Sequence, residues 1–147
     1  MNNNEIHKIA SNFRKAIIIA KNNGEFSLHD RMSRFPYGCC DDACDLLAYY
    51  LFINYNIHTK QGNGVYRDND FYNTTNHAWL ILNGDTVIDI TGDQFAFAGF
   101  SDEVYVRREN SFYQNLEDKR ILDNYDITQS ERLWNDYKSI IKYMPTE

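Results

Sequence analysis

The chain has 147 residues, of which 43% are hydrophobic and 15% aromatic, and its formal net charge is -6. This length is typical of one domain, and the apolar content is sufficient for a buried core, which excludes a disordered chain. The acidic balance gives no basic footprint for nucleic acid or for an anionic membrane surface. We therefore expect a single domain over residues 1–147 that binds neither nucleic acid nor membrane.

The N-terminal sequence MNNNEIHKIASNF lacks the basic start and the apolar run of a signal peptide. The apolar run AIIIA that follows is far shorter than the roughly 20 residues that span a bilayer. Three cysteines are an odd number, which fits a reducing compartment better than a secreted disulfide framework. These features predict a cytoplasmic protein, or one that is exported without a cleaved signal peptide.

Two helices are predicted in the first third of the chain. Residues 4–22 carry apolar side chains at helical spacing, and the asparagines before them can cap the helix. A second helix is predicted to begin at residue 39 or 40 and to end near residue 54. Asp41 and Asp42 suit the positive N-terminal end of that helix.

The clearest strand signal is the hairpin HAWLILNGDTVIDI at 77–90, where two apolar runs flank an Asn-Gly turn. The segment before it is polar and rich in turn residues, with a short strand predicted at 65–67. EVYVRR at 103–108 predicts a further strand, and helical spacing from residue 130 predicts a closing helix. Two helices, an antiparallel sheet and a final helix define an α+β domain.

A candidate catalytic triad spans these elements. Cys40 lies at the predicted helix start, His77 opens a strand, and Asp89 lies on the partner strand. In such a triad the thiolate attacks a carbonyl, the imidazole transfers the proton, and the carboxylate orients the ring. A helix start favours the thiolate, and its free N–H groups can bind an oxyanion.

The loop of the hairpin decides whether this triad can form. A two-residue turn of Asn83 and Gly84 places His77 and Asp89 on opposite faces of the sheet. A three-residue loop over residues 82–84 instead places His77 directly opposite Asp89, with glycine in the left-handed position that such loops favour. The triad therefore predicts an odd loop.

The ordered strings GCC and NHAWLILNGDTVIDIT resemble the core of the transglutaminase-like branch of the papain-like cysteine enzymes. There a helix-starting cysteine precedes a histidine in H-x-W and an aspartate in D-x-T, and Trp79 and Thr91 match these patterns beside His77 and Asp89. The wider strings FPYGCC and VIDITGDQF resemble small bacterial members, in which the cysteine lies two residues after the glycine. That spacing selects Cys40.

The resemblance covers roughly residues 35–95 and implies a papain-like or transglutaminase-like core, with N-terminal helices packed on the sheet. It implies a cofactor-independent thiol protease, amidase, deamidase or transglutaminase that forms a thioester on a protein or peptide substrate. A papain-type oxyanion glutamine is missing, because the first glutamine of the chain is Gln61. Backbone N–H groups and Tyr37 are then the candidate oxyanion donors, and Gln94 is a candidate substrate-binding residue.

Other interpretations stay open at this stage. Cys44 fits a core position, and Cys39 is the alternative nucleophile if the helix begins one residue earlier. A zinc site built from the cysteines and a histidine lacks paired C-x₂-C spacing, so no metal is predicted, and a vicinal disulfide would be strained. Asp93 is an alternative orienting carboxylate, and Gln94 can equally bind backbone. A catalytically silent protein-binding module on the same scaffold is the alternative function.

Overall fold

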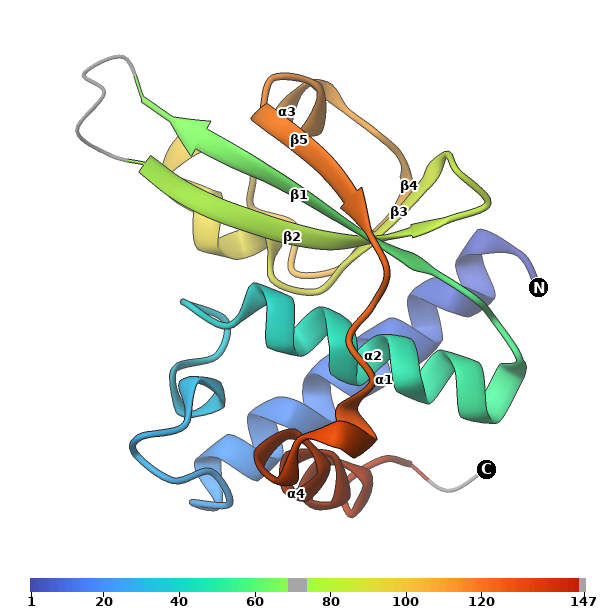
Figure 1. Cartoon of the computed structure of the whole chain (residues 1–147), viewed down its shortest axis with the longest axis vertical. Helices are drawn as coiled ribbons and strands as arrows, with labels where there is room; N and C mark the ends of the chain where they lie inside the picture. Colours follow the sequence, from blue (N-terminus) through green and yellow to red (C-terminus); the bar gives the residue numbers. More distant parts are fainter. Residues whose placement is uncertain (69–73, 146–147) are drawn as a thin grey trace.

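The computed structural model describes residues 1–68 and 74–145 (Figure 1). In chain order the elements are α1 (Asn3–Asn22), η1 (Arg31–Arg34), α2 (Cys40–Tyr55), β1 (Lys60–Arg67), β2 (Thr74–Leu82), β3 (Thr86–Asp89), η2 (Gly92–Ala98), β4 (Tyr105–Arg108), α3 (Ser111–Gln114), β5 (Glu117–Leu122), η3 (Ile127–Gln129) and α4 (Glu131–Ile141).

The five strands form one antiparallel sheet in the order β4-β3-β2-β1-β5. Helices α1, α2 and α4 gather on one side of it, below the sheet in Figure 1. Helix α2 packs on β2, while α1 packs against β4 and α4. The predicted α+β class and antiparallel sheet are confirmed. No helix within the described residues is long and apolar enough to cross a membrane.

The two N-terminal helices form close to where the sequence predicts them. Helix α1 begins after Asn2, whose side chain accepts a hydrogen bond of 2.9 Å from the Glu5 N–H. Its apolar stripe is buried, so tertiary packing adds to its intrinsic helix propensity. Helix α2 begins at Cys40 and has Cys39 as its N-cap residue. The predicted strand at 103–108 and the closing helix from residue 130 are also present, as β4 and α4.

The hairpin has an odd loop, but its bounds differ from the prediction. The loop consists of Asn83, Gly84 and Asp85, and the ladder closes with Leu82 paired to Thr86. Positive φ angles of 56° and 80° at Asn83 and Gly84 suit a primed turn, and the Asp85 N–H donates to the Leu82 carbonyl. Compared with the predicted loop of residues 82–84, Asp85 joins the loop and Leu82 joins the ladder.

This register changes how the two triad residues face each other. Because Leu80 pairs with Ile88, Asp89 lies level with Trp79 rather than with His77. The expectation that His77 stands directly opposite Asp89 is therefore wrong. The two residues are diagonal neighbours across β2 and β3, and both side chains still lie on the same face because the shift is an even number of residues.

The sequence prediction missed α3, β5 and the short helices η1, η2 and η3, and it made β1 and β2 too short. Strand β1 begins at Lys60 rather than at residue 65, because its glycines serve packing and not turns: a Cβ on Gly62 would lie 2.5 Å from the Trp79 ring. Strand β5 was not predicted because all six of its residues are exposed and show no alternation of burial. Helix α3 is too short to give a periodic signal.

The two faces of the sheet pack against different cores. The inner face packs against α1 and α2, with α4 packed on those two helices, in a largely aliphatic core that includes Ala78, Leu80 and Ile88. The outer face carries a smaller, mostly aromatic cluster, whose buried members are Trp79, Val87, Phe95, Phe100, Tyr105, Tyr113 and Leu116. His77 and Asp89 share the outer face with Trp79 and Val87 by strand alternation.

A buried arginine ties α1 to the segment that follows β3. Arg14 is 6% exposed and makes a two-pronged ion pair with Asp93, with distances of 3.0 and 2.8 Å. It also donates to the carbonyls of Ile90 and Glu103, at 2.6 and 3.2 Å. The guanidinium thereby fixes the chain immediately after Asp89.

We expect Arg14→Met to lower the free energy of unfolding by about 3 kcal/mol, because it leaves the part-buried Asp93 carboxylate and two carbonyls without their partner. Urea unfolding followed by circular dichroism measures this. Arg120→Met is the matched control, since Arg120 is exposed on β5 and should change stability little. Equal effects of the two substitutions would contradict the anchoring role of Arg14.

Candidate functional site

Of the three cysteines, one combines partial exposure with a place at the start of a helix. Cys40 is half-buried and is the first residue of α2, whose N-cap Cys39 makes no side-chain capping hydrogen bond. Burial raises the pKa of Cys39 to about 12 and raises the pKa of Cys44 well above its ordinary value. Thiolate formation is therefore disfavoured at both buried sulfurs.

His77 and Asp89 are in direct contact on the outer face of the sheet. The His77 Nε2 atom lies 2.6 Å from Asp89 Oδ2, and the two residues are 0% and 2% exposed. The imidazole is surrounded by aromatic rings, with its centroid 5.0 Å from that of Phe95 and 5.7 Å from that of Trp79. These rings keep water from the pair, so its charge interaction acts in a medium of low dielectric constant.

Every oxygen of the Asp89 carboxylate has a donor. Besides His77, the Tyr113 hydroxyl donates to Oδ2 at 2.6 Å, and the Thr91 N–H and hydroxyl donate to Oδ1 at 2.9 and 3.4 Å. Burial alone would raise the pKa of Asp89, but the charge of His77 and these hydrogen bonds hold that pKa below its usual value. The carboxylate is therefore an anion under ordinary conditions.

The second nitrogen of His77 faces the groove that holds Cys40. Burial alone would lower the pKa of His77, but the charge and hydrogen bond of Asp89, with a smaller contribution from the nearby Cys40, raise it to about 9. The Cys40 sulfur itself lies 3.9 Å from the carbonyl oxygen of Asn76, the residue before His77. Gln94 Nε2 lies 3.1 Å from His77 Nδ1. The imidazole thus joins Asp89 at Nε2 to the groove at Nδ1.

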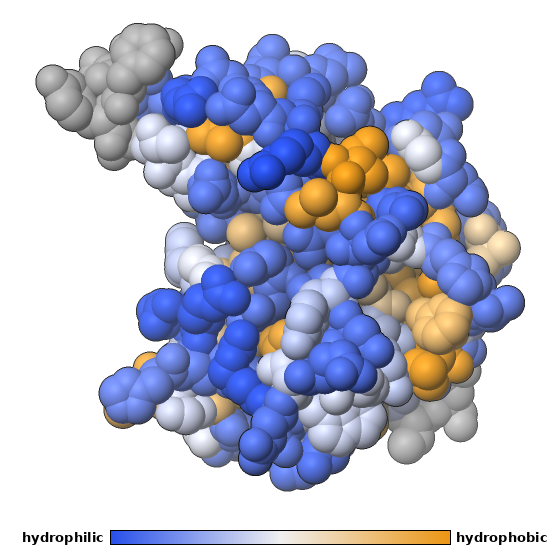
Figure 2. All heavy atoms as spheres, viewed as in Figure 1, coloured by the Kyte–Doolittle hydropathy of each residue, from blue (hydrophilic) through white to orange (hydrophobic). Residues whose placement is uncertain are grey.

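The groove beside Cys40 has a volume of about 440 Å³ and runs between the start of α2 and the first half of β2. Figure 2 shows the molecule indented on its left side, between the sheet above and the helices below, where α2 begins in Figure 1. Besides Cys40 and His77, its polar walls include Arg31, Asn63, Thr74, Thr75, Asn76 and Gln94.

Tyr37 lies outside the groove residues. Its side chain is 59% exposed, and its backbone N–H donates to the Arg34 carbonyl. The structure therefore gives Tyr37 no place as an oxyanion donor. Gln94, in contrast, lies in the groove beside the imidazole, although its contact is with His77 rather than with backbone.

Arginines balance the acidic first turn of α2. Asp41 and Asp42 follow Cys40 directly, and their charges would oppose a neighbouring thiolate. Arg31 contacts Asp41 at 3.3 Å and Asp42 at 2.9 Å, and Arg132 contacts Asp42 at 2.9 Å. These ion pairs also tie the start of α2 to η1 and α4.

The structure also places the alternative orienting carboxylate and the residues of the alternative metal site. Asp93 pairs with Arg14 and not with His77, so the alternative orienting carboxylate lies elsewhere. Cys39, Cys40 and Cys44 are all free thiols. Within residues 1–68 and 74–145, no three His, Cys, Asp or Glu side chains cluster so that they could hold a metal ion.

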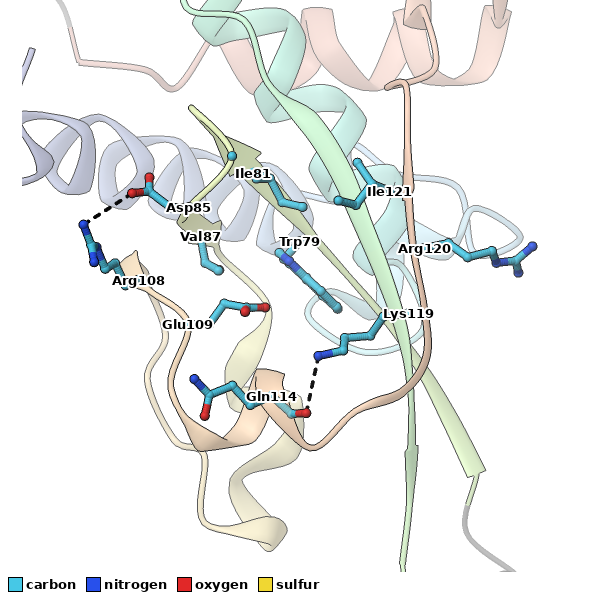
Figure 3. A pocket seen from close by; sticks show the side chains of 11 residues that line it. Trp79, Ile81, Asp85, Val87, Arg108, Glu109, Gln114, Lys119, Arg120 and Ile121 are labelled. Atoms are coloured by element: carbon cyan, nitrogen blue, oxygen red, sulfur yellow. Dashed lines mark hydrogen bonds and ion pairs between the residues drawn. The ribbon is translucent and has the colours of Figure 1, made fainter.

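A second, larger pocket of about 710 Å³ lies on the outer face of the sheet (Figure 3). Trp79, Ile81 and Val87 form its apolar floor, and charged side chains from β4 and β5 surround it. Figure 3 shows Lys119 reaching across it toward the carbonyl of Gln114. None of its lining residues is a cysteine or histidine, so the chemistry-bearing groups gather in the smaller groove.

Two residues of the site, Tyr113 and Asn63, were not predicted from the sequence. Tyr113 contacts Asp89 from α3, a four-residue helix whose sequence signal is the Asn110 side chain that caps it. Asn63 lines the groove from β1, within a segment that composition assigns to turns.

Comparison of the chain with protein-family models, with curated proteins and with solved structures gives no match. The interpretation of the site therefore depends on its own geometry.

We expect the His77 imidazole to titrate near pH 9, and Asp89→Asn to move that titration to lower pH, because burial then acts without the opposing carboxylate charge. Imidazole NMR shifts measured across pH report both values. Asp85→Asn, at the exposed turn of the same hairpin, should leave the titration unchanged. A wild-type midpoint at or below about 6.5 would contradict the ion pair.

The same pair links stability to pH. The folded-state pKa of His77 is raised from 6.5 to about 9, so its stabilisation is complete below pH 6.5 and is lost as pH rises through about 9. The unfolding free energy of the wild type should therefore fall more steeply than that of Asp89→Asn across this window.

Proposed function

We propose that this protein is a cysteine-dependent acyl-transfer enzyme that acts on an amide bond through Cys40, His77 and Asp89 and a thioester intermediate. The observation that carries the proposal is the buried imidazole of His77, held by Asp89 at Nε2 and turned at Nδ1 toward the groove of Cys40. An orienting carboxylate, an imidazole and a sulfur at an uncapped helix start are the parts that nucleophilic catalysis needs.

The order and placement of these groups support a papain-like or transglutaminase-like core as part of the same proposal. The cysteine begins a helix that packs on the strand of the histidine, and the aspartate ends the next strand. Trp79 and Thr91 are the other residues of the resemblance. The Trp79 ring packs beside His77, and the Thr91 N–H donates to Asp89.

In the acylation step, the Cys40 thiolate attacks the amide carbonyl carbon, a C–S bond forms, and the carbonyl electron pair moves to oxygen. When the oxyanion collapses, the C–N bond breaks, and the His77 imidazolium gives its Nδ1 proton to the leaving amine. Asp89 keeps the ring oriented and stabilises its positive charge.

In the second step, His77 removes a proton from water or from an amine that attacks the thioester. The C–S bond breaks, and Cys40 leaves as a thiolate beside the imidazolium. Water gives hydrolysis, as in a peptidase, amidase or deamidase, and an amine gives transfer, as in a transglutaminase. A groove of about 440 Å³ suits a side chain or a chain end of a protein or peptide substrate.

One observation favours the second candidate, a catalytically silent binding module. The Gln94 amide nitrogen lies 3.1 Å from His77 Nδ1, the atom that the mechanism assigns to the sulfur and the leaving amine. If Gln94 keeps that atom as an acceptor, the imidazole is neutral and its Nδ1 atom does not serve the sulfur.

Alkylation by iodoacetamide with peptide mapping tests which sulfur reacts. We expect rapid modification of Cys40 in the folded protein, and none in Cys40→Ala, because Cys39 and Cys44 are buried. Cys39→Ala and Cys44→Ala should be labelled like the wild type. Labelling that follows Cys39 would move the nucleophile by one residue.

The rate of this labelling tests the coupling to His77. Near neutral pH, His77→Ala should be alkylated at Cys40 more slowly than the wild type, because the partner that takes up the thiol proton is gone. Asp89→Asn should slow alkylation less, since the imidazole still stands beside the groove. Equal alkylation rates in the three proteins would favour the binding module.

A further inference from the structure

A chain of polar side chains leads from the interior to the groove of Cys40. Asp45 lies on α2 and Gln61 on β1, and each is 7% exposed. Gln61 Nε2 donates to Asp45 Oδ1 at 3.0 Å, and Asn63 Nδ2 donates to Gln61 Oε1 at 3.1 Å. Asn63 is only partly buried and lines the groove that Cys40 and His77 also line.

The contacts at the buried end of these hydrogen-bonded side chains set the direction in which each amide donates. Asp45 Oδ1 also accepts the Tyr125 backbone N–H at 3.1 Å, so this oxygen is an acceptor for two donors. In the structure Gln61 presents its N–H to Asp45 and its carbonyl oxygen to Asn63. Asn63 in turn must direct its NH₂ group toward Gln61, rather than its carbonyl oxygen.

This arrangement leaves one donor of Asn63 for the groove. The amide NH₂ has two N–H bonds, of which one goes to Gln61, and the other has no hydrogen-bond acceptor within residues 1–68 and 74–145. The first N–H groups of α2, including that of Cys40, likewise have no intrahelical partner and receive no side-chain cap from Cys39.

We propose that Asn63 is the side-chain donor of the oxyanion hole, and that Gln61 and Asp45 are positioning residues that hold its amide in place. This inference rests on the proposed acyl-transfer function. The acyl oxygen would accept one hydrogen bond from the Cys40 backbone N–H and one from Asn63 Nδ2. Asn63 thereby takes the role for which the sequence offered Tyr37, which lies outside the groove.

The test compares two reactions of the same sulfur. Acylation of Cys40 by p-nitrophenyl acetate passes through a tetrahedral oxyanion, whereas alkylation by iodoacetamide is a direct displacement at carbon and forms none. Asn63→Ala should slow single-turnover acylation on the order of 10²-fold and leave the alkylation rate unchanged. Gln61→Leu should slow acylation less, because it releases the Asn63 amide without removing it.

Asn54→Ala is the control, since Asn54 is exposed on α2 and donates to the carbonyl of Tyr50 in its own helix. It should change neither rate. If Asn63→Ala does not fold, Asn63→Leu keeps a similar side-chain volume, removes the donor without adding a charge and should give the same loss.

The outcomes separate the two proposals. Wild-type acylation that persists in both Asn63 variants would overturn the role of Asn63 while the acyl-transfer function stands. Acylation and alkylation that fall together would also overturn it, since Asn63 would then support the groove and not the oxyanion. A wild-type protein that is alkylated at Cys40 but never acylated would overturn the proposed function itself.

Discussion

The buried carboxylate of Asp89 is the constraint around which the outer half of the molecule is organised. An anion that is 2% exposed is stable only if both of its oxygens have donors. Those donors come from three places in the chain: His77 on β2, Tyr113 on α3 and Thr91 directly after β3. Meeting this requirement brings α3 back over the sheet, turns the chain sharply after β3, and holds the imidazole by one nitrogen so that the other points to the groove. The ion pair of Arg14 with Asp93 secures the same turn from the opposite layer.

A second set of charges acts at the start of α2, and its purpose is different. The carboxylates of Asp41 and Asp42 complement the helix dipole but also stand next to Cys40. Arg31 and Arg132 compensate them through ion pairs, and Arg132 reaches Asp42 from α4. The helix start is therefore fixed to its neighbours, and the two arginines offset part of the negative charge beside the sulfur. Cys40 and His77 line one groove from two layers, the helices and the sheet, and the Arg14–Asp93 ion pair links these layers.

The sequence allowed the shared face of His77 and Asp89 to be predicted but not their exact register. Alternation along a strand depends only on whether the loop is odd, and any odd loop puts both side chains on one face. The register depends on whether Asp85 belongs to the ladder or to the loop. It belongs to the loop, so Asp89 lies diagonal to His77 rather than directly opposite it. Tyr113 could not be predicted, because a contact over 24 residues from a four-residue helix leaves no local pattern. Strand β5 is held by backbone pairing to β1, and no side-chain periodicity reports such pairing.

The four residues QGNG at 61–64 explain how one strand can serve both sides of the site. Their glycines made the segment resemble a turn, yet alternation in β1 places Gly62 and Gly64 on the outer face and Gln61 and Asn63 on the inner face. A Cβ on Gly62 would collide with the Trp79 ring, and one on Gly64 would lie 2.9 Å from Leu116 Cβ. The absent side chains thus let the aromatic cluster close over the sheet and keep the imidazole dry. Gln61 and Asn63 on the inner face are polar instead, and they form a chain of hydrogen bonds from the buried Asp45 to the groove. A segment whose glycines suggest a turn is therefore a regular strand. One of its faces allows close packing of the aromatic cluster, and the other carries the hydrogen bonds that lead to the groove.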